Sequence, residues 1–193
     1  MKRRIVLALT GASGANYGVR LLEELGKSAD VETHLIVSKA GYLNLATELE
    51  TGRSEIEALA DVAYSDSDIG AAIASGSFKT DAMIIAPCSM RTLAGVATGL
   101  ASSLITRAAD VTLKERRRLV LLTREAPLNL IHLRNMTTVT EMGGIVFPPV
   151  PAFYLGLESI EAMVDQTVGR ILELVGVDSP LLERWRGVNS GSS

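Results

Sequence analysis

Short apolar runs recur along the chain, and longer amphipathic segments separate them. The apolar runs are typical of strands buried on both faces, and they span residues 5–9, 32–37, 82–86, 119–123 and 144–147. The amphipathic segments predict helices over 17–25, 40–50, 93–100, 104–117, 128–138 and 160–175. Because strand and helix alternate, we expect right-handed βαβ units and an α/β fold with a doubly wound parallel sheet.

Residues 51–80 interrupt this alternation. Scattered charges and small residues give no clean period there, so we expect a weak helix followed by a flexible loop. A chain of 193 residues can enclose one good core but is short for two. We therefore expect one domain over residues 1–187, and a disordered tail over the Ser/Gly-rich residues 188–193.

Composition narrows the range of functions. Hydrophobic residues make up 47% of the chain and aromatic residues only 4%, so the core must be largely aliphatic, which favours α/β over a β-sandwich. A net charge of −3 and a pI near 5.5 argue against a surface that neutralises a phosphate backbone. One Trp, four Tyr and three Phe offer few platforms for stacking bases. We expect no nucleic-acid partner.

The single cysteine and the first apolar run indicate the compartment. Cys88 alone excludes an intrachain disulfide and a multi-cysteine metal site, and it fits a reducing compartment, so we expect a cytoplasmic protein. The run 5–9 is shorter than the roughly 7–15 apolar residues of a secretory signal. No window reaches the roughly 18 apolar residues of a membrane span, so we expect no membrane association.

A glycine-rich loop, TGASGANYG at 10–18, follows the first predicted strand. Ligands of open parallel sheets bind beyond the carboxyl ends of the strands, close to helix N-termini. Gly11 and Gly14 can adopt positive φ and let a ligand approach the backbone, and Ser13 adds a hydroxyl. Alone, these glycines also fit a tight structural turn. The spacing is not GxGxxG, and no tyrosine has the lysine four residues later that some nicotinamide-dependent reductases need.

A second anion-binding loop, APCSMRTLAG at 86–95, follows the third predicted strand. Pro87 is expected to end the strand, Ser89 is a good N-cap, and Arg91 and Thr92 can reach an anion at the helix start. Cys88 is a poor candidate nucleophile because no histidine lies near it in sequence.

The helix after the second predicted strand carries two further candidates, one at each end. Ser38 stands where the helix begins, and an N-cap is its simplest role. Glu48 lies at the far end of the same helix.

Charged and aromatic residues follow the last two predicted strands. Arg124 and Glu125 project where the fourth strand ends, and Pro127 suits the first turn of the next helix. The stiff segment FPPVPAFY is expected to present Phe153 and Tyr154 as a rigid aromatic wall, with Arg170 following on the last helix.

Arg107, Asp110 and Lys114 share one face of a predicted helix. Their spacing is i, i+3 and i+7, and by itself it favours a solvated face with a local pair between Arg107 and Asp110.

Taken in order, these segments resemble the UbiX-type flavin prenyltransferases. The similarity runs through TGASGANYG, SKA, ATE, APCSMRTLAG, TRAADVTLKERR, TREAPL, PPVPAFY, Arg170 and Trp185. It implies a flavodoxin-like, Rossmann-like three-layer sandwich. It also implies an enzyme that joins the dimethylallyl group of dimethylallyl monophosphate to reduced FMN, which adds a fourth ring to the flavin. The prenylated FMN would serve a partner decarboxylase. Family members usually form homododecamers in which neighbouring subunits complete each active site.

The resemblance also implies a role for individual residues. The FMN contacts would be Gly11, Ala12, Ser13, Ser38, Ser89, Met90, Arg91, Thr92 and Arg124. The pocket for dimethylallyl phosphate would be Arg107, Lys114, Glu125, Tyr154 and Arg170. The catalytic residues would be Ser13, Glu48, Glu125 and Lys114. Lys114, Arg124 and Arg170 would clamp the leaving phosphate. Arg118 stands where the family commonly has proline, without an evident effect on the site.

The reaction needs a proton acceptor but no evident metal. These loops contain no histidine, so the acceptor is a carboxylate or the released phosphate, and Glu125 is our candidate for relaying the proton. No carboxylate cluster has metal-binding spacing, so we expect a metal-independent reaction. One alternative function is that of an FMN-dependent cysteine decarboxylase. Such enzymes need a catalytic His early in the chain and an Asn-containing loop at the position where this chain has PCSMRT. The other is a flavin carrier without catalysis.

Overall fold

Six parallel strands form one sheet in the order β3-β2-β1-β4-β5-β6. The structure is a computed structural model that describes residues 2–185 and 187. The strands are β1 Arg3–Leu9, β2 Val31–Val37, β3 Val62–Ser65, β4 Ala82–Cys88, β5 Arg118–Thr123 and β6 Ile145–Val146. This is the Rossmann order, and without the short edge strand β3 it becomes the flavodoxin order. The predicted doubly wound parallel sheet is confirmed.

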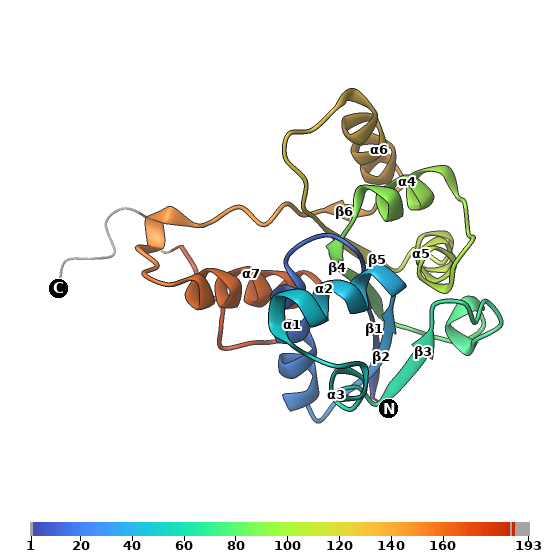
Figure 1. Cartoon of the computed structure of the whole chain (residues 1–193), viewed down its shortest axis with the longest axis horizontal. Coiled ribbons are helices and arrows are strands. Elements are labelled where there is room, and N and C mark those ends of the chain that lie inside the picture. The colour runs from blue at the N-terminus through green and yellow to red at the C-terminus, as the bar shows by residue number, and fades with distance from the viewer. Residues whose placement is uncertain (1, 186, 188–193) are drawn as a thin grey trace.

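Helices cover both faces of the sheet (Figure 1). They are α1 Ala15–Lys27, α2 Lys39–Leu49, α3 Arg53–Glu57, α4 Met90–Thr98, α5 Leu104–Lys114, α6 Leu130–Glu141 and α7 Ile160–Leu174, with 3-10 turns η1 Ala72–Ala74 and η2 Phe153–Leu155. Side chains of α1, α2, α3 and α7 share one core, and those of α4, α5, α6 and η1 share the other. α4 also packs against α6, and α1 against α7. The result is a three-layer sandwich.

The two cores explain why the apolar runs lack a polar face. In β1, Ile5 and Leu7 belong to the α1/α7 core, whereas Val6 and Ala8 belong to the α4/α5 core. All seven residues of β4 are buried. A parallel strand covered on both faces needs apolar residues at consecutive positions, and that is the pattern from which these strands were predicted.

The edge strand β3 is missing from the prediction. Residues 51–80 contain the expected weak helix, α3, but the region predicted as a flexible loop includes β3 and η1. β3 has only four residues, which alternate between half-buried and exposed, and it pairs on one side with β2. So short an alternation cannot be told from a loop by pattern alone.

Two prolines lie differently from their predicted positions. β4 continues through Pro87 to Cys88, with a register shift between Ile85 and Cys88, and the Ala86–Pro87 peptide is cis. Pro127 precedes α6 instead of lying in its first turn, because Asn129 caps the helix by accepting the N–H of His132. Among the described residues no helix is long and apolar enough to cross a membrane. The predicted disordered tail, 188–193, lies outside the described residues.

Candidate active site

Loops from β1 and β4 are joined at the carboxyl edge of the sheet by Thr10. Its hydroxyl donates to the carbonyl of Pro87 at 2.8 Å and accepts the N–H of Ser89 at 2.8 Å. Its backbone N–H also donates to Pro87, at 3.1 Å. Since Thr10 is buried, these bonds hold the glycine-rich loop and the start of α4 in a fixed relation.

The glycine-rich loop also lies against the start of α2. A Cβ added to Gly11 would stand closer than 3.0 Å to the Cβ of Ala40, so glycine is required here by close packing. The Asn44 side chain donates to the carbonyl of Ala12 at 2.7 Å, and the N–H of Ser38 donates to Leu9 at 3.0 Å. Gly11, Ala12 and Ser38 are therefore neighbours. Of the two glycines expected at positive φ, Gly14 has φ 109°, whereas Gly11 is not in that region.

Glu48 supplies the N-terminal cap that α1 lacks in its own sequence. Gly14 stands at the N-cap without a side chain, and the Glu48 carboxylate accepts the N–H groups of Gly14 and Ala15, each at 2.9 Å. Burial raises the pKa of Glu48, but these two N–H bonds, the hydroxyl of Ser13 and the charge of Arg124 outweigh it, so the net pKa is lowered from 4.5. Glu48 is thus a carboxylate at neutral pH, next to Ser13 and Arg124.

Ser89 caps α4 as predicted. The hydroxyl of Ser89 caps α4 by accepting the N–H of Thr92 at 3.3 Å, and Ser38 caps α2 in the same way. Arg91 is exposed, whereas Met90 packs against the α4/α5 core and so offers its backbone. Cys88 is fully buried, and burial raises the pKa of its thiol. Such a thiol is a poor nucleophile.

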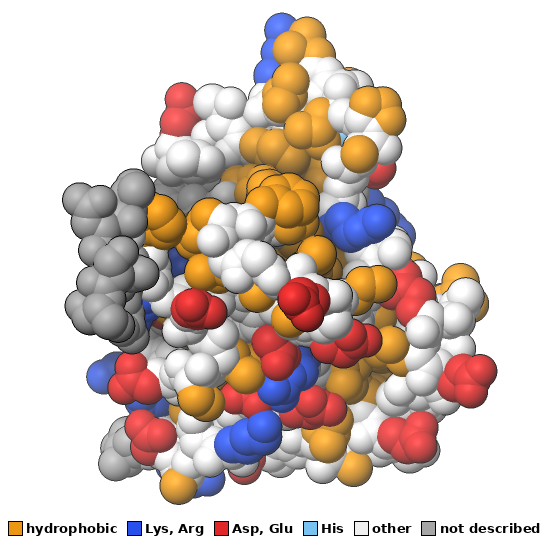
Figure 2. All heavy atoms as spheres, turned by 90° about the vertical axis from the view of Figure 1, so that its left-hand side faces the viewer, with side chains coloured by type: hydrophobic (Ala, Val, Ile, Leu, Met, Phe, Trp, Pro, Cys, Tyr) orange, Lys and Arg blue, Asp and Glu red, His pale blue; other side chains and the backbone are white. Residues whose placement is uncertain are grey.

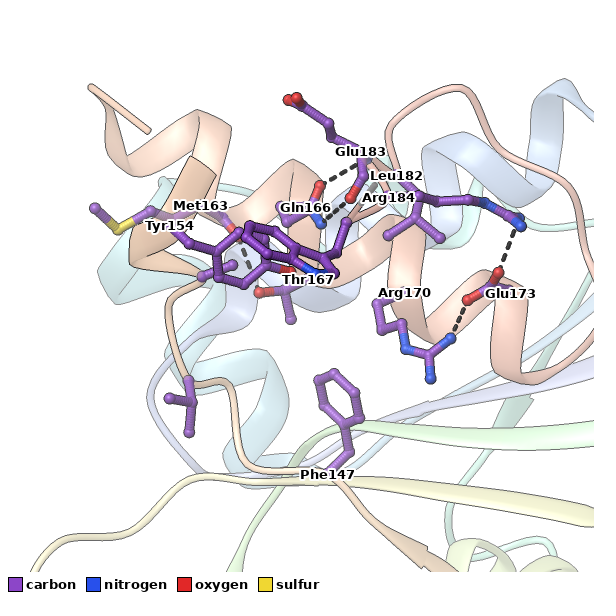
Figure 3. A pocket seen from close by; sticks show the side chains of 13 residues that line it. Phe147, Tyr154, Met163, Gln166, Thr167, Arg170, Glu173, Leu182, Glu183 and Arg184 are labelled. Carbon is purple, nitrogen blue, oxygen red and sulfur yellow. Dashed lines mark hydrogen bonds and ion pairs between the residues drawn. The ribbon is translucent and has the colours of Figure 1, made fainter. Parts of the chain in front are cut away.

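Tyr154 and Arg170 line a cavity of about 350 Å³ between α7, the segment after β6 and residues 182–185 (Figure 3). Its walls are Phe147, Val150, Ala152, Tyr154, Met163, Gln166, Thr167, Arg170, Glu173, Leu182, Glu183, Arg184 and Trp185. The rings of Tyr154 and Trp185 meet edge to face with centroids 5.1 Å apart. Phe147 lies across the cavity from α7 and directly follows β6, at the same edge of the sheet as Arg124. Of the predicted wall of Phe153 and Tyr154, only Tyr154 lines this cavity, where its aromatic neighbours are Phe147 and Trp185.

Arg107 and Lys114 lie apart from the other predicted site residues. Arg107 donates to the carbonyl of Ala74 at 3.2 Å and pairs with Asp110 at 2.9 Å, the local pair that its spacing favoured. Lys114 pairs with Glu115 at 2.5 Å, at the end of α5 where the chain turns into the start of β5. That is the amino edge, about 20 Å from the carboxyl edge by the length of a seven-residue strand. The single chain does not bring Lys114 to Arg124 or Arg170.

Comparison with known proteins identifies the family. The family model described as Flavoprotein matches residues 1–172. The flavin prenyltransferase UbiX of Neisseria meningitidis serogroup B is 55% identical over 188 residues, which cover 97% of this chain and 99% of that protein. The chain belongs to the flavoprotein family as a UbiX-type member. The resemblance noted from the sequence motifs is therefore confirmed.

Two solved UbiX-type structures share the fold over nearly the whole chain. AnUbiX (PadA1) in complex with FMN and dimethylallyl pyrophosphate gives a TM-score of 0.94 at 50% identity, covering 97% of this chain and 99% of the other. The dodecameric FMN-dependent Ubix-like decarboxylase of Escherichia coli O157:H7 gives 0.93 at 45% identity, covering 95% and 100%. The flavodoxin-like three-layer sandwich expected of a UbiX-type member is thereby confirmed.

Several residues that build the site were not predicted. Thr10 and Asn44 hold the glycine-rich loop in place, and Glu173 and Arg184 line the cavity beside Arg170. One signal was present in the sequence, because Gln166, Arg170 and Glu173 recur at helical spacing on one face of α7. The contacts of Thr10 and Asn44 join distant segments and have no such signal.

Proposed function

We propose that this protein is a flavin prenyltransferase that joins the dimethylallyl group of dimethylallyl monophosphate to reduced FMN. The prenylated FMN then serves a partner decarboxylase. The observation that carries this proposal is the convergence of the Gly11–Ser13 loop, the Ser89 loop and Arg124 at one edge of the sheet, in a UbiX-type chain. The lone buried Cys88 supports a cytoplasmic location.

The carboxyl edge suits a flavin phosphate. The N-termini of α2 and α4 open toward this edge, and helix N-termini bind anions. Arg124 is exposed and adds a positive charge beside Gly14. The N-terminus of α1 is already occupied by Glu48, so α2 and α4 remain for the phosphate. When bound, reduced FMN supplies the nucleophilic ring that accepts the dimethylallyl group.

The cavity beside α7 suits the dimethylallyl phosphate. Arg170 offers a guanidinium to the leaving phosphate, and Phe147, Tyr154 and Trp185 provide apolar walls that exclude water from an allyl cation. Because cations hold the leaving phosphate, a metal is not needed. The part of the chain that is described holds no cluster of three or more His, Cys, Asp or Glu side chains that suits a metal ion.

Glu125 is the better placed of the two catalytic carboxylates to accept a proton. Glu48 accepts two backbone N–H groups and has a lowered pKa, so it is a weak base that holds Ser13 and the start of α1. Glu125 is exposed, and its Oε1 accepts the N–H of its own neighbour Ala126 at 3.1 Å. It is free to relay the proton that leaves the flavin ring.

Lys114 and Arg107 enter the proposal from a neighbouring copy of the chain. The Escherichia coli structure is dodecameric, and α6 of this chain exposes Leu130, Ile131 and Leu133, which a neighbour would cover. Figure 2 shows apolar side chains gathered over the upper part of the molecule, where α6 lies. We therefore propose a homododecamer in which α5 of one subunit reaches the cavity of another.

Cysteine decarboxylation is not favoured. The early histidine, His34, lies buried in β2, where its Nε2 contacts Glu32 at 2.9 Å and its Nδ1 contacts Tyr64 at 3.0 Å. It is therefore occupied within the sheet and does not reach the carboxyl edge, where that reaction would need it.

In the deciding experiment the purified protein is incubated anaerobically with reduced FMN and dimethylallyl monophosphate, and the molecular mass of the extracted flavin is then measured by mass spectrometry. A gain of one five-carbon unit is expected, and unchanged FMN refutes the proposal. A parallel reaction with the diphosphate identifies the preferred donor. Activity should survive a chelator, since loss that magnesium restores would contradict the metal-independent reaction. Glu125→Gln should still bind FMN but form no product, whereas a mere carrier would show no product in either protein.

A further inference from the structure

An acidic side chain stands between two arginines in the cavity beside α7. Glu173 binds Arg170 through Oε2 and Arg184 through Oε1, the latter at 2.8 Å (Figure 3). Both arginine side chains are at least half exposed, and ion pairs of that kind are weak. An anion of higher charge that enters the cavity can therefore replace Glu173 as the partner of either arginine.

The segment that carries Arg184 is fixed to α7 by a pair of hydrogen bonds. The Gln166 side chain donates to the carbonyl of Glu183 at 2.8 Å and accepts the N–H of the same residue at 2.9 Å. Gln166, Arg170 and Glu173 lie on one face of α7, so the segment runs along the same face as the arginine. On the other side of Arg184, the ring of Trp185 packs against Tyr154. Arg184 is thus attached at both of its neighbours.

The charge of the cavity also calls for a second cation. A phosphate monoester carries about −1.5 to −2 at neutral pH. Of the two arginines that line the described cavity, Arg170 is the one that the family pattern assigns to this phosphate, and Glu173 lies beside it. With Arg184 included, two guanidinium groups line the described cavity beside the carboxylates of Glu173 and Glu183, so Arg184 restores positive charge that these acidic side chains offset.

We propose that Arg184 is a second phosphate-binding residue for the prenyl donor, held in position by Gln166 and paired with Glu173 until the donor binds. The inference rests on the proposed function, because the phosphate is that of dimethylallyl monophosphate. Arg184 contacts the substrate, whereas Gln166 is a positioning residue that acts through it.

The test compares Arg184→Gln with the native protein in steady-state prenyl transfer. Loss of one charge-assisted hydrogen bond to phosphate should raise KM for dimethylallyl monophosphate about tenfold or more, with kcat little changed. The inhibition constant of inorganic phosphate should rise in parallel, and the affinity for FMN should stay native. The matched control is Arg53→Gln, since Arg53 is 63% exposed and pairs with Glu57, as Arg184 is 68% exposed and pairs with Glu173.

Gln166 tests how Arg184 is held. Gln166→Leu removes both bonds to Glu183 and should raise KM in the same direction with little change in kcat. Gln166→Glu keeps the acceptor for the N–H of Glu183 and should restore part of the affinity. Native KM in Gln166→Leu would overturn the positioning role.

The outcomes for the proposed function and for Arg184 can be separated. If the native protein makes product and Arg184→Gln keeps native KM and native phosphate inhibition, the phosphate-binding role of Arg184 is refuted and the proposed function stands. If the native protein makes no product, calorimetric titration with dimethylallyl monophosphate and with inorganic phosphate decides. Roughly tenfold weaker binding by Arg184→Gln supports the role, and equal or absent binding by both proteins overturns it.

Discussion

Replacing Gly11 with alanine should disrupt flavin binding through one defined contact. The added Cβ would stand closer than 3.0 Å to the Cβ of Ala40, whereas carbon atoms in good contact are about 3.5–4.0 Å apart. The glycine-rich loop and the start of α2 must therefore separate by roughly 1–1.5 Å, at an overpacking cost of about 1–3 kcal/mol. Because Gly11 and Ser38 lie on the two sides of this contact, the dissociation constant for FMN should rise about 10- to 100-fold.

The assay is a fluorescence titration of FMN with flavin-free protein. A second substitution at the same contact should restore FMN binding. Ala40→Gly removes the atom that the new methyl group would meet, so Gly11→Ala combined with Ala40→Gly should bind FMN close to the native value. Gly26→Ala is the matched control, since a Cβ there comes no nearer than 3.8 Å to any atom beyond its chain neighbours and the backbone of its own helix. Native affinity in Gly11→Ala, or a double variant as weak as the single one, would refute this reasoning.

Three further outcomes follow from the structure. Folding lowers the pKa of Glu48, so this carboxylate stabilises the fold above the unfolded pKa near 4.5, and the stabilisation is lost as pH falls through the folded pKa. The difference in urea midpoint between the native protein and Glu48→Gln should therefore shrink below pH 4.5. The Arg20 side chain is 23% exposed and forms ion pairs with Asp165 of α7 and with the nearly buried Glu24 of α1, each at 2.6 Å. Arg20→Gln should therefore lower the free energy of unfolding by about 1–3 kcal/mol. No measurable loss would show that these ion pairs do not stabilise the packing of α1 against α7. Inactive Lys114→Gln and Arg170→Gln proteins, dissociated and reassembled together, should regain activity if the two residues come from different subunits, and continued inactivity of the mixture would place them in one.

The sequence predicted the parts of the site that depend on local rules. Ser38 and Ser89 are N-caps as expected, because a hydroxyl at the start of a helix finds the N–H three residues later whatever the rest of the fold does. The central strands were likewise predicted, because burial on both faces leaves a continuous apolar run. β3 was missed because an edge strand of four half-exposed residues carries too few positions to show its period.

Contacts between distant segments were beyond this reasoning. Glu48 was assigned to the site by resemblance, but its contact with the first turn of α1 joins residues 34 apart in the chain. Arg184 pairs with Glu173 from a segment whose backbone Gln166 binds at Glu183. Nothing in the local sequence of either glutamate indicates which helix or segment it will meet.

The position of Lys114 follows from topology and points to the assembly. In a parallel sheet each crossover helix runs back from the carboxyl edge to the amino edge, so the last residue of α5 must lie away from the loops that hold Ser13 and Arg124. α5 has 11 residues and therefore runs about 16 Å, too far for a lysine side chain to span back. If Lys114 serves the reaction as the family pattern implies, it must do so in the cavity of another subunit. The exposed apolar side chains of α6 are then part of the same requirement, because an active site shared between chains needs an interface that holds them together.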